Sequence, residues 1–556
     1  MDNIKDIIVQ VVASHLKQIK KEFGFKINED DITVELPKKE EYGDYSTPIV
    51  LKIARDNKLN PIEIGAKLQK SISEAKHPYF KSVEFYKPGF INFFISKEIL
   101  TKNLEEVYLL KEKYGRRKNP HPEKILIEFV SANPTGPLNV VSARAATVGD
   151  VLSKLFILDG HQITKEYYIN DAGRQVNLLA ESMLIRIKQH LGEKCELKDE
   201  HYHGEYISEL ARQMLDEGEF EKIKNDQDVL TKIKEYTLEK LINSQKDVLK
   251  KYNIEFDNWF HESSLRKSDL LKECHQLLDK KKLLYKEEDK TFFRSTLFGD
   301  EKDRVIIRED ETPTYFFVDI AYHYNKIKRG FTCLIDLWGP DHDGYIPRMK
   351  GALSALDYGD AKFKVVIIQQ VNLLEKSRKV QMSKRLGTIV LMEDLINDIG
   401  VDASRFFFLH RSISSHLDFD LDLARKQSED NPVFYVQYAY ARICNIFKQA
   451  ENKKIKVEYT LYKNDWEWKE EEVKLIKKMF DFPLMIQQAA ENIQPNLLPN
   501  YLLDLAGIFH QFYTQCRVLD EKQKEITQNR LFLSECTRQI LYNGLKIMGV
   551  TAPERM

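Results

Sequence analysis

The segment EFVSANPTGPLNVVSARAATVGD, from Glu128 to Asp150, constrains the fold of this chain most strongly. It overlaps the apolar run KILIEFV (residues 124–130), which is short and rich in β-branched residues, as buried strands are. Two prolines and a glycine between residues 133 and 137 exclude helix and regular strand there, and the pattern after residue 142 predicts a helix. A strand, a tight turn and a helix N-terminus can bind an anion, because the first helical N–H groups are unpaired and the helix dipole favours negative charge. Such turns are common in α/β proteins, so the segment alone leaves phosphate binding as one of two interpretations.

Length and composition limit the class of protein. A chain of 556 residues holds about three or four domains at roughly 100–200 residues each. The formal net charge is −1, so a nucleic acid would have to be bound by local basic patches. The six cysteines form no Cys-x-x-Cys pair, which argues against structural zinc and against a disulfide framework. No window contains about 18 uninterrupted apolar residues, so we expect no membrane span and a cytoplasmic protein.

The pattern along the chain predicts three parts. Residues 1–118 form a small α+β domain that ends in the polar, proline-broken linker KEKYGRRKNPHP. Strand and helix signals alternate over residues 119–425, which predicts βαβ units and a parallel sheet. Residues from about 178 to 300 are charged and helical, and we expect them to be an insertion in that sheet. Residues 426–556 are almost purely helical in pattern.

A second segment, VQMSKRLGTIVLMEDLI, begins at Val380. It predicts a short loop, with Lys384 and Arg385 next to each other, ahead of a helix. These side chains can neutralise a polyphosphate as its leaving group departs. A Lys-Arg pair in a loop is ordinary surface in most proteins, but together with the anion-binding turn the functional interpretation is favoured.

These two segments resemble the His-x-Gly-His region and the Lys-Met-Ser-Lys loop of the class I aminoacyl-tRNA synthetases. The resemblance is to the arginyl-tRNA synthetases in particular and runs along essentially the whole chain. Further similar blocks occur in the same order: YYINDAGRQV (167–176), WFHESSL (259–265), FRSTLFGDEKDRV (293–305), TPTYFFVDIAYH (312–323), DLWGPDHDGY (336–345), FYVQYAYARI (434–443) and the terminal APERM.

The resemblance implies a two-step reaction. Arginine attacks the α-phosphate of Mg-ATP to give arginyl-adenylate and pyrophosphate, and the arginyl group then passes to tRNA(Arg). It also implies a Rossmann-type catalytic domain, an N-terminal domain that recognises the tRNA elbow (D-loop), an all-α anticodon-binding domain and a monomer. Mg²⁺ is expected to arrive with ATP, without a protein-bound metal site.

The arginine pocket can be assigned by the same resemblance. A guanidinium is planar, charged and a five-donor fork, so its pocket needs carboxylates and neutral acceptors. Tyr315 and Asp319 are four residues apart and share one helix face, which suits the guanidinium. Without a functional role, Tyr315 would be a core aromatic residue and Asp319 a carboxylate on the helix surface. The full expected set is Glu128, Asn133, Tyr315, Asp319 and Asp341 or His342.

The expected ATP site departs from the family pattern. Asn139-Val140-Val141-Ser142 replaces His-x-Gly-His, and Gln381 replaces the first lysine of the lysine loop. A β-branched Val141 pushes adenine away from a backbone that a glycine would leave open. Either the pocket is rebuilt and active, which the intact arginine pocket favours, or the chain is a weak or inactive tRNA-binding paralogue. The expected ATP-binding residues are Asn139, Val141, Ser142, Met382, Ser383 and Lys384, of which Asn139, Ser142 and Lys384 are the catalytic candidates.

Aromatic residues and arginines mark the expected RNA contacts. Tyr435, Tyr438 and Arg442 form one helical stripe, on which single-stranded bases can stack; periodicity alone would favour a core stripe. The resemblance assigns anticodon binding to Tyr435, Tyr438, Arg442 and Tyr513, with Met556 nearby, and an elbow contact to Asn92. A nucleotidyltransferase of the same superfamily would explain the sheet but not these two ends.

Overall fold

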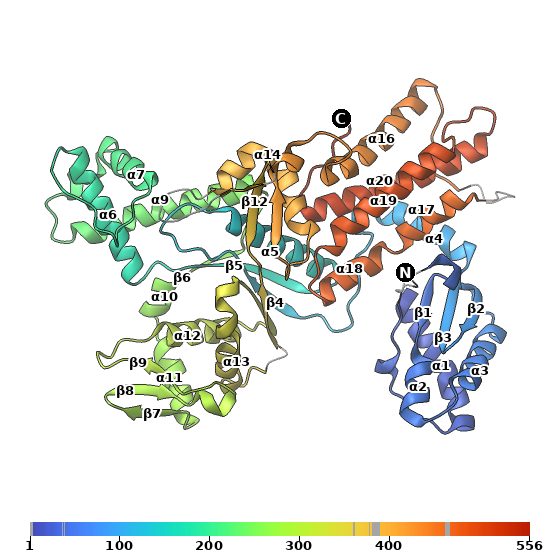
Figure 1. Ribbon diagram of the computed structural model, residues 1–556, viewed down its shortest axis with the longest axis horizontal. Helices are drawn as coiled ribbons and strands as arrows, with labels where there is room; N and C mark the ends of the chain where they lie inside the picture. Colours follow the sequence, from blue (N-terminus) through green and yellow to red (C-terminus); the bar gives the residue numbers. More distant parts are fainter. Residues whose placement is uncertain are drawn as a thin grey trace.

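The computed structural model describes residues 4–35, 37, 39–359, 362–376, 378–380, 390–461 and 468–556. Figure 1 shows a parallel sheet at the centre of the molecule, a helical arm on one side, a helical domain on the other, and the N-terminal domain beneath that helical domain. The predicted fold class is confirmed: along the chain an α+β domain is followed by an α/β catalytic core of Rossmann type and then by an all-α domain.

The N-terminal domain is a three-stranded sheet covered by helices. Its β2–β3 hairpin is antiparallel, as the KPG turn between two apolar runs predicts. The helix α4 that follows packs against the C-terminal helices α17 and α20, so this helix joins the N-terminal domain to the end of the chain. The elements are α1 (Ile4–Phe23), η1 (Glu29–Asp31), η2 (Glu40–Tyr42), β1 (Tyr45–Thr47), α2 (Ile49–Asn57), α3 (Pro61–Glu74), β2 (Phe80–Tyr86), β3 (Phe90–Ile95), α4 (Lys97–Leu110) and η3 (Lys111–Lys113).

The central sheet has five parallel strands in the order β11-β10-β4-β5-β6. The helix α5 (Val140–Leu158) connects β4 to β5, which confirms the predicted βαβ unit. Strand order reverses between β4 and β10, and ligands of open α/β sheets bind at such a switch point, beyond the carboxyl ends of the strands. The strands are β4 (Lys124–Glu128), β5 (Gln162–Ile169), β6 (Asn258–His261), β10 (Cys333–Trp338) and β11 (Phe363–Ile367).

The segment between β5 and α12 departs from the expected helical insertion of residues 178–300. Only four helices form the arm, and the chain then returns to the central sheet at β6 and adds the antiparallel sheet β7-β8-β9. These strands are four residues long, too short for an alternation to stand out from the charged helices around them. The elements are α6 (Arg174–His190), α7 (Glu205–Asp216), α8 (Glu219–Ile223), α9 (Val229–Lys251), α10 (Glu262–Lys267), α11 (Leu270–Lys280), β7 (Leu284–Glu287), β8 (Lys290–Phe293), η4 (Ser295–Phe298), β9 (Arg304–Ile307), α12 (Tyr315–Lys328), η5 (Pro340–Tyr345) and α13 (Ile346–Ala355).

A small sheet, β13-β12-β14, leads from the catalytic domain to the helical domain. The predicted all-helical pattern after residue 426 is confirmed over the part of it that the structure describes. The elements are β12 (Val371–Glu375), β13 (Arg378–Lys379), α14 (Met392–His410), β14 (Leu417–Asp420), α15 (Leu421–Arg425), α16 (Pro432–Asn452), α17 (Glu470–Phe480), α18 (Phe482–Glu491), α19 (Leu497–Gln515) and α20 (Lys524–Met548).

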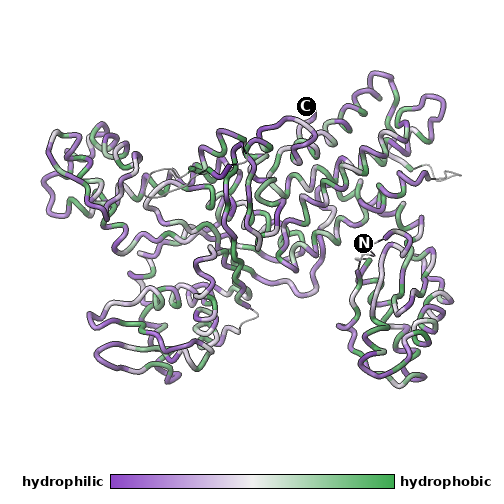
Figure 2. The backbone as a smooth tube through the Cα atoms, viewed as in Figure 1, coloured by the Kyte–Doolittle hydropathy of each residue, from purple (hydrophilic) through white to green (hydrophobic). Residues whose placement is uncertain are grey.

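Both faces of the central sheet are buried. Along β4, Ile125 and Ile127 join a core that extends into the N-terminal and helical domains, whereas Leu126 joins a second core with α11, α12 and α13. Figure 2 shows the central strands as one of the most hydrophobic parts of the chain. All six cysteines are free thiols, and no helix in the described ranges is long and apolar enough to cross a membrane.

Candidate active site

Two carboxylates meet at the switch point of the sheet. Glu128, the last residue of β4, pairs in register with Asp336 of β10. The buried Lys326 of α12 lies between them: its Nζ donates to Glu128 Oε2 at 2.6 Å and to Asp336 Oδ1 at 3.0 Å. The strands therefore bring acidic side chains together at the point where a ligand site is expected.

Glu128 lies beneath this site and is only 8% exposed. Ser131 Oγ donates to its Oε1 at 2.8 Å, so both carboxylate oxygens already accept hydrogen bonds. Burial raises the pKa of Glu128, and Lys326 partly offsets this rise. Burial also opposes the charge of Asp336, but Lys326 and His323 hold its pKa at about 2. Glu128, Lys326 and Asp336 thus form a buried cluster of charges beneath the region where a ligand is expected.

The helix α12 presents the predicted guanidinium residues on one face. Thr314 caps the helix by accepting from Phe317 N, so Tyr315 is the first helical residue and Asp319 follows one turn later. Tyr315 is 60% exposed, and the Asp319 side chain is 29% exposed. Tyr345 of η5 is hydrogen-bonded to Asp319, and burial together with this carboxylate raises the pKa of the Tyr345 hydroxyl. Tyr315 is thus not a core tyrosine. Asp319 is hydrogen-bonded to the protein through Tyr345, while part of its side chain remains exposed.

The segment that follows β5 lies between Asn133 and Tyr315. Asn133 Nδ2 donates to Gln175 Oε1 at 2.8 Å, and a Cβ at Gly173 would lie 3.6 Å from the Tyr315 hydroxyl. Gly173 has a φ of +91°, which a side chain would strain. The structure thus places these predicted residues on either side of the Gly173 turn.

Asp341 and His342 lie on η5, next to the partner of Asp319. Both side chains are exposed, and His342 Nε2 lies 3.6 Å from Asp341 Oδ2. Because Tyr345 joins η5 to α12, these residues lie at the rim of the same region but contact none of the buried carboxylates described above.

The predicted anion-binding turn is capped by its own side chain. Asn139 is the N-cap, and the helix begins at Val140, two residues before the predicted start. Val141 N and Ser142 N donate to Asn139 Oδ1 at 3.0 and 3.1 Å. The expectation that the first helical N–H groups are unpaired is therefore corrected for these two. The Val141 side chain is 40% exposed.

Residues 390–392, which follow the lysine loop in sequence, pair with this turn. Met382, Ser383 and Lys384 lie outside the described residues. The chain that follows them pairs with the turn: Val140 N donates to Val390 O at 3.2 Å, and Met392 N donates to Leu138 O at 2.9 Å. The two segments, about 240 residues apart in sequence, are thus joined at the helix N-terminus.

No sequence pattern indicated the arm residues that donate hydrogen bonds to the backbone of the turn. Gln245 of α9 donates to Gly136 O at 2.9 Å. The single proton of the Tyr167 hydroxyl is shared between Gln245 Oε1 at 2.9 Å and Ala132 O at 3.1 Å. The Tyr206 hydroxyl of α7 donates to Thr135 O at 2.6 Å. Polar residues in charged helices carry no signal of such a role, so only the tertiary structure shows that the arm supports the turn.

Arg144, in the second turn of α5, is another residue that sequence reasoning missed. It is fully buried, and its guanidinium donates to the carbonyl oxygens of Gln369, Ser412 and Ser415. Burial lowers its pKa to about 10. The helix that carries Asn139 is thereby tied to the small sheet from which the lysine loop leaves.

The predicted anticodon stripe is assembled around His510 of α19. Arg442 NH2 donates to the Tyr438 hydroxyl at 2.8 Å, and its NH1 lies 3.0 Å from His510 Nδ1. The same guanidinium lies over the rings of Tyr438 and Tyr513, and Tyr435 meets the His510 ring edge to face. Burial and Arg442 lower the pKa of His510 to about 4, so a neutral imidazole accepts from the arginine.

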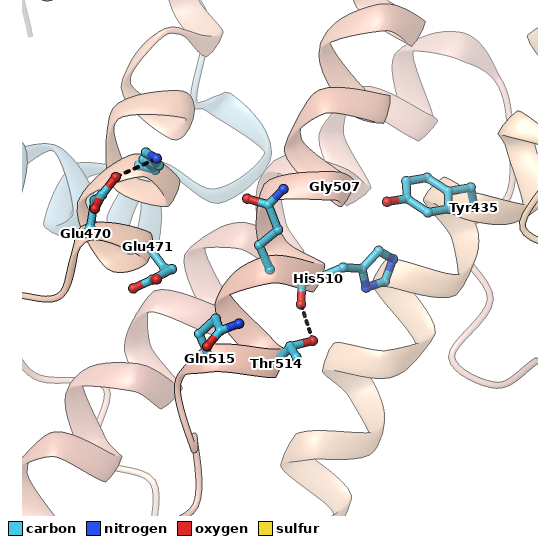
Figure 3. Close-up of a pocket in the computed structure, with 9 residues that line it drawn as sticks. Tyr435, Glu470, Glu471, Gly507, His510, Thr514 and Gln515 are labelled. Atoms are coloured by element: carbon cyan, nitrogen blue, oxygen red, sulfur yellow. Dashed lines mark hydrogen bonds and ion pairs between the residues drawn. The ribbon is translucent and has the colours of Figure 1, made fainter. Parts of the chain in front are cut away.

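A cavity of about 490 Å³ opens beside this cluster. Figure 3 shows it among helices α16, α17 and α19, with Tyr435 and His510 on one side and Glu470 and Glu471 on the other. Carboxylates repel phosphate, so a nucleic acid would have to present a base here. Its lining residues are Tyr435, Glu470, Glu471, Lys474, Gly507, His510, Gln511, Thr514 and Gln515.

The two remaining RNA candidates differ in exposure. Met556 is exposed at the end of the chain. Asn92 is 2% exposed within β3, and its Oδ1 accepts from Ser46 Oγ at 2.6 Å. This burial contradicts the expected direct contact of Asn92 with RNA, because its amide completes a hydrogen bond inside the sheet.

Family comparisons cover all three parts of the chain. Residues 3–95 match the arginyl tRNA synthetase N terminal domain, residues 103–407 match the catalytic domain of tRNA synthetases class I (R), and residues 436–556 match the DALR anticodon binding domain.

Curated relatives match over nearly their whole length. An arginine–tRNA ligase of Thermotoga maritima is 41% identical over 97% of this chain and 98% of its own. One of Bacillus licheniformis is 40% identical over 100% of both chains. The solved structure of Thermus thermophilus arginyl-tRNA synthetase superposes with a TM-score of 0.75 at 20% identity, over 99% of this chain and 100% of its own, which supports the fold.

Proposed function

The chain belongs to the arginyl-tRNA synthetase family and is an arginine–tRNA ligase, and we propose that its reaction takes place at the carboxyl edge of the central sheet. Nothing in the comparisons favours the non-catalytic alternative. The observation that supports the proposed location is the link from Glu128 and Asp336 at the switch point through His323 to Asp319, with α5 beginning after β4 at the same edge of the sheet.

Arginine binding is proposed for the region between α12 and the Gly173 turn. Asp319 and Tyr315 receive the guanidinium, since a carboxylate and a neutral acceptor suit its donors. Asn133 lies on the opposite side of the turn and binds the amino acid backbone. Glu128 supports this end electrostatically from beneath, and Asp341 or His342 closes the rim.

ATP is proposed to bind at the N-terminus of α5, as the magnesium complex that is the substrate. Asn139 uses its side-chain oxygen as the helix cap, so its amide N–H groups are what remains for a phosphate oxygen. Ser142 offers a hydroxyl in the same turn, adenine lies near Val141, and the loop residues Met382, Ser383 and Lys384 supply a donor and a cation. The carboxylate oxygen of arginine attacks the α-phosphorus, and the bond to pyrophosphate breaks.

The RNA is proposed to bind along the two ends of the chain. Tyr435, Tyr438, Arg442 and Tyr513 contact the anticodon of tRNA(Arg), with Met556 close by, and the N-terminal domain contacts the tRNA elbow. We further propose domain boundaries at residues 118/119 and 425/426, a cytoplasmic location and a monomeric state.

Aminoacylation of tRNA(Arg) tests the proposed pocket. Arginine should be attached, whereas citrulline, which has nearly the same shape but a neutral ureido group, should not. Citrulline leaves Asp319 without a cationic partner, so it should not compete at concentrations near the arginine KM. Equal attachment of citrulline, or no attachment of arginine, would overturn the proposal.

A further inference from the structure

His323 is a buried residue of α12, one turn after Asp319, to which the reaction above assigns no part. Its Nε2 lies 2.8 Å from Asp336 Oδ2. Its Nδ1 lies 2.9 Å from the Asp319 carbonyl oxygen and 3.2 Å from Asp319 Oδ1. A neutral imidazole has one donor and one acceptor, whereas both ring nitrogens here face oxygen acceptors. The geometry therefore requires the doubly protonated, cationic ring.

The surroundings of His323 agree with a cation. Burial and the nearby Lys326 lower the pKa of His323, but Asp336 and Asp319 raise it further, to about 9. Glu128 lies beyond Lys326, and the ring of His323 meets Phe363 edge to face at a centroid distance of 5.4 Å. With every group ionised, the two cations His323 and Lys326 face the three carboxylates Asp319, Asp336 and Glu128. A fourth buried carboxylate, Glu166, also acts on Lys326 but is paired with Arg329, so the cluster keeps one negative charge in excess.

We infer that His323 is a positioning residue that, as an imidazolium, fixes the Asp319 carboxylate toward the guanidinium of arginine. Asp336 accepts a hydrogen bond from Nε2, on the side of the ring away from Asp319. Tyr345 donates a second hydrogen bond to the Asp319 carboxylate. The one excess negative charge is left for the substrate cation. The inference rests on the proposed binding of the guanidinium by Asp319.

His323→Gln tests this assignment. A glutamine amide can donate toward Asp336, but it is neutral, and because both of its N–H groups are on one nitrogen it cannot replace donors on opposite sides of a ring. The KM for arginine should rise by about tenfold or more, a change of ~1.4 kcal/mol, while kcat and the KM for ATP stay within about threefold. His275→Gln is the matched control. It makes the same change on the neighbouring helix α11, where the His275 ring packs on Phe317 of α12.

The pH dependence separates charge from shape. Above the pKa of His323 the wild-type ring is neutral too, so the advantage over His323→Gln should disappear. The ratio of the variant KM to the wild-type KM for arginine should therefore fall toward 1 between about pH 7 and about pH 10, and the titration of the substrate amino group cancels in this ratio. A purely structural defect would leave the ratio constant.

Three outcomes decide the matter. If the wild-type protein attaches no arginine to tRNA, the proposed function fails. If it is active and His323→Gln keeps the arginine KM of His275→Gln, the positioning inference alone fails. If His323→Gln does not fold, the wild-type protein decides: the inhibition constant of a guanidino acid without an α-amino group should rise as the pH passes about 9, and a flat profile would overturn the inference.

Discussion

The Asp319 carboxylate is placed by contacts from its own helix and from η5, although part of its side chain is open to solvent. His323 reaches it from the same helix, and behind that ring stands Asp336 of β10. Tyr345 reaches it from η5. Because these contacts orient the carboxylate before a ligand arrives, binding arginine costs little further ordering.

Asp319→Asn should weaken arginine binding selectively. The amide keeps the size of the side chain but removes the charge that faces the guanidinium, and it leaves His323 with one carboxylate. We expect kcat/KM for arginine to fall by about 100-fold, or ~3 kcal/mol, with the KM for ATP nearly unchanged, as measured by aminoacylation at varied arginine and ATP. Asp343→Asn, on the exposed turn of η5, is the control, and an unchanged arginine KM in Asp319→Asn would contradict the assignment.

Residue by residue, the sequence pointed to Tyr315, Asp319 and the buried Glu128, but it gave no sign of His323 and Lys326. Tyr315 and Asp319 were identified through the family resemblance, and their spacing predicted that both lie on one helix face. His323 and Lys326 continue that face into the core, where helical periodicity alone would expect apolar side chains. Their burial is possible only because β4 and β10 supply Glu128 and Asp336, and that pairing is a long-range contact.

At the scale of elements, the strand–turn–helix unit was predictable and its cap was not. The apolar run and the proline-rich turn fixed β4 and the start of α5 to within a few residues. Asn139 was expected to face a phosphate, but its side-chain oxygen accepts from Val141 N and Ser142 N. The arm helices that support the turn through Gln245 and Tyr206 act over distances in sequence that no local pattern covers.

Two substitutions of Asn139 separate the cap from the reaction. Asp is as good an N-cap as Asn, and the helix dipole favours its charge, so Asn139→Asp should keep the melting temperature. It should nevertheless lower kcat/KM for ATP by about 100-fold, because a carboxylate repels phosphate and has no N–H to donate. Asn139→Ala should lower both, with a stability loss of about 1 kcal/mol. Thermal unfolding and ATP-dependent kinetics give the two readouts, and full activity in Asn139→Asp would limit Asn139 to a structural role.

At the scale of the whole molecule, one buried guanidinium joins the catalytic and helical domains. Arg405 of α14 donates to Asp150 of α5 at 2.6 Å, to Tyr252 O at 3.0 Å, and to Met548 O at the end of α20. The end of arm helix α9, the helix α5 and the last helix α20 therefore meet at the Arg405 side chain. The three-part order was predictable from composition, but this junction was not, since its members are about 100 to 400 residues apart.

Tyr438→Ala should affect the RNA substrate alone. It removes a ring available for stacking and frees Arg442 from the hydroxyl it now contacts. Stacking on an aromatic ring contributes about 1–3 kcal/mol per base, so the KM for tRNA should rise by about tenfold while the KM for ATP stays nearly unchanged. Aminoacylation at varied tRNA and ATP measures both, and an equal rise in the two constants would refute the stacking role.

The ATP half of the proposed site differs from the family pattern at Asn139, Val141 and Ser142. Arginine-dependent ATP–pyrophosphate exchange in the presence of tRNA(Arg) measures its first step directly. We predict exchange that requires arginine and is not supported by citrulline. Absence of exchange from protein that still binds tRNA would contradict the account.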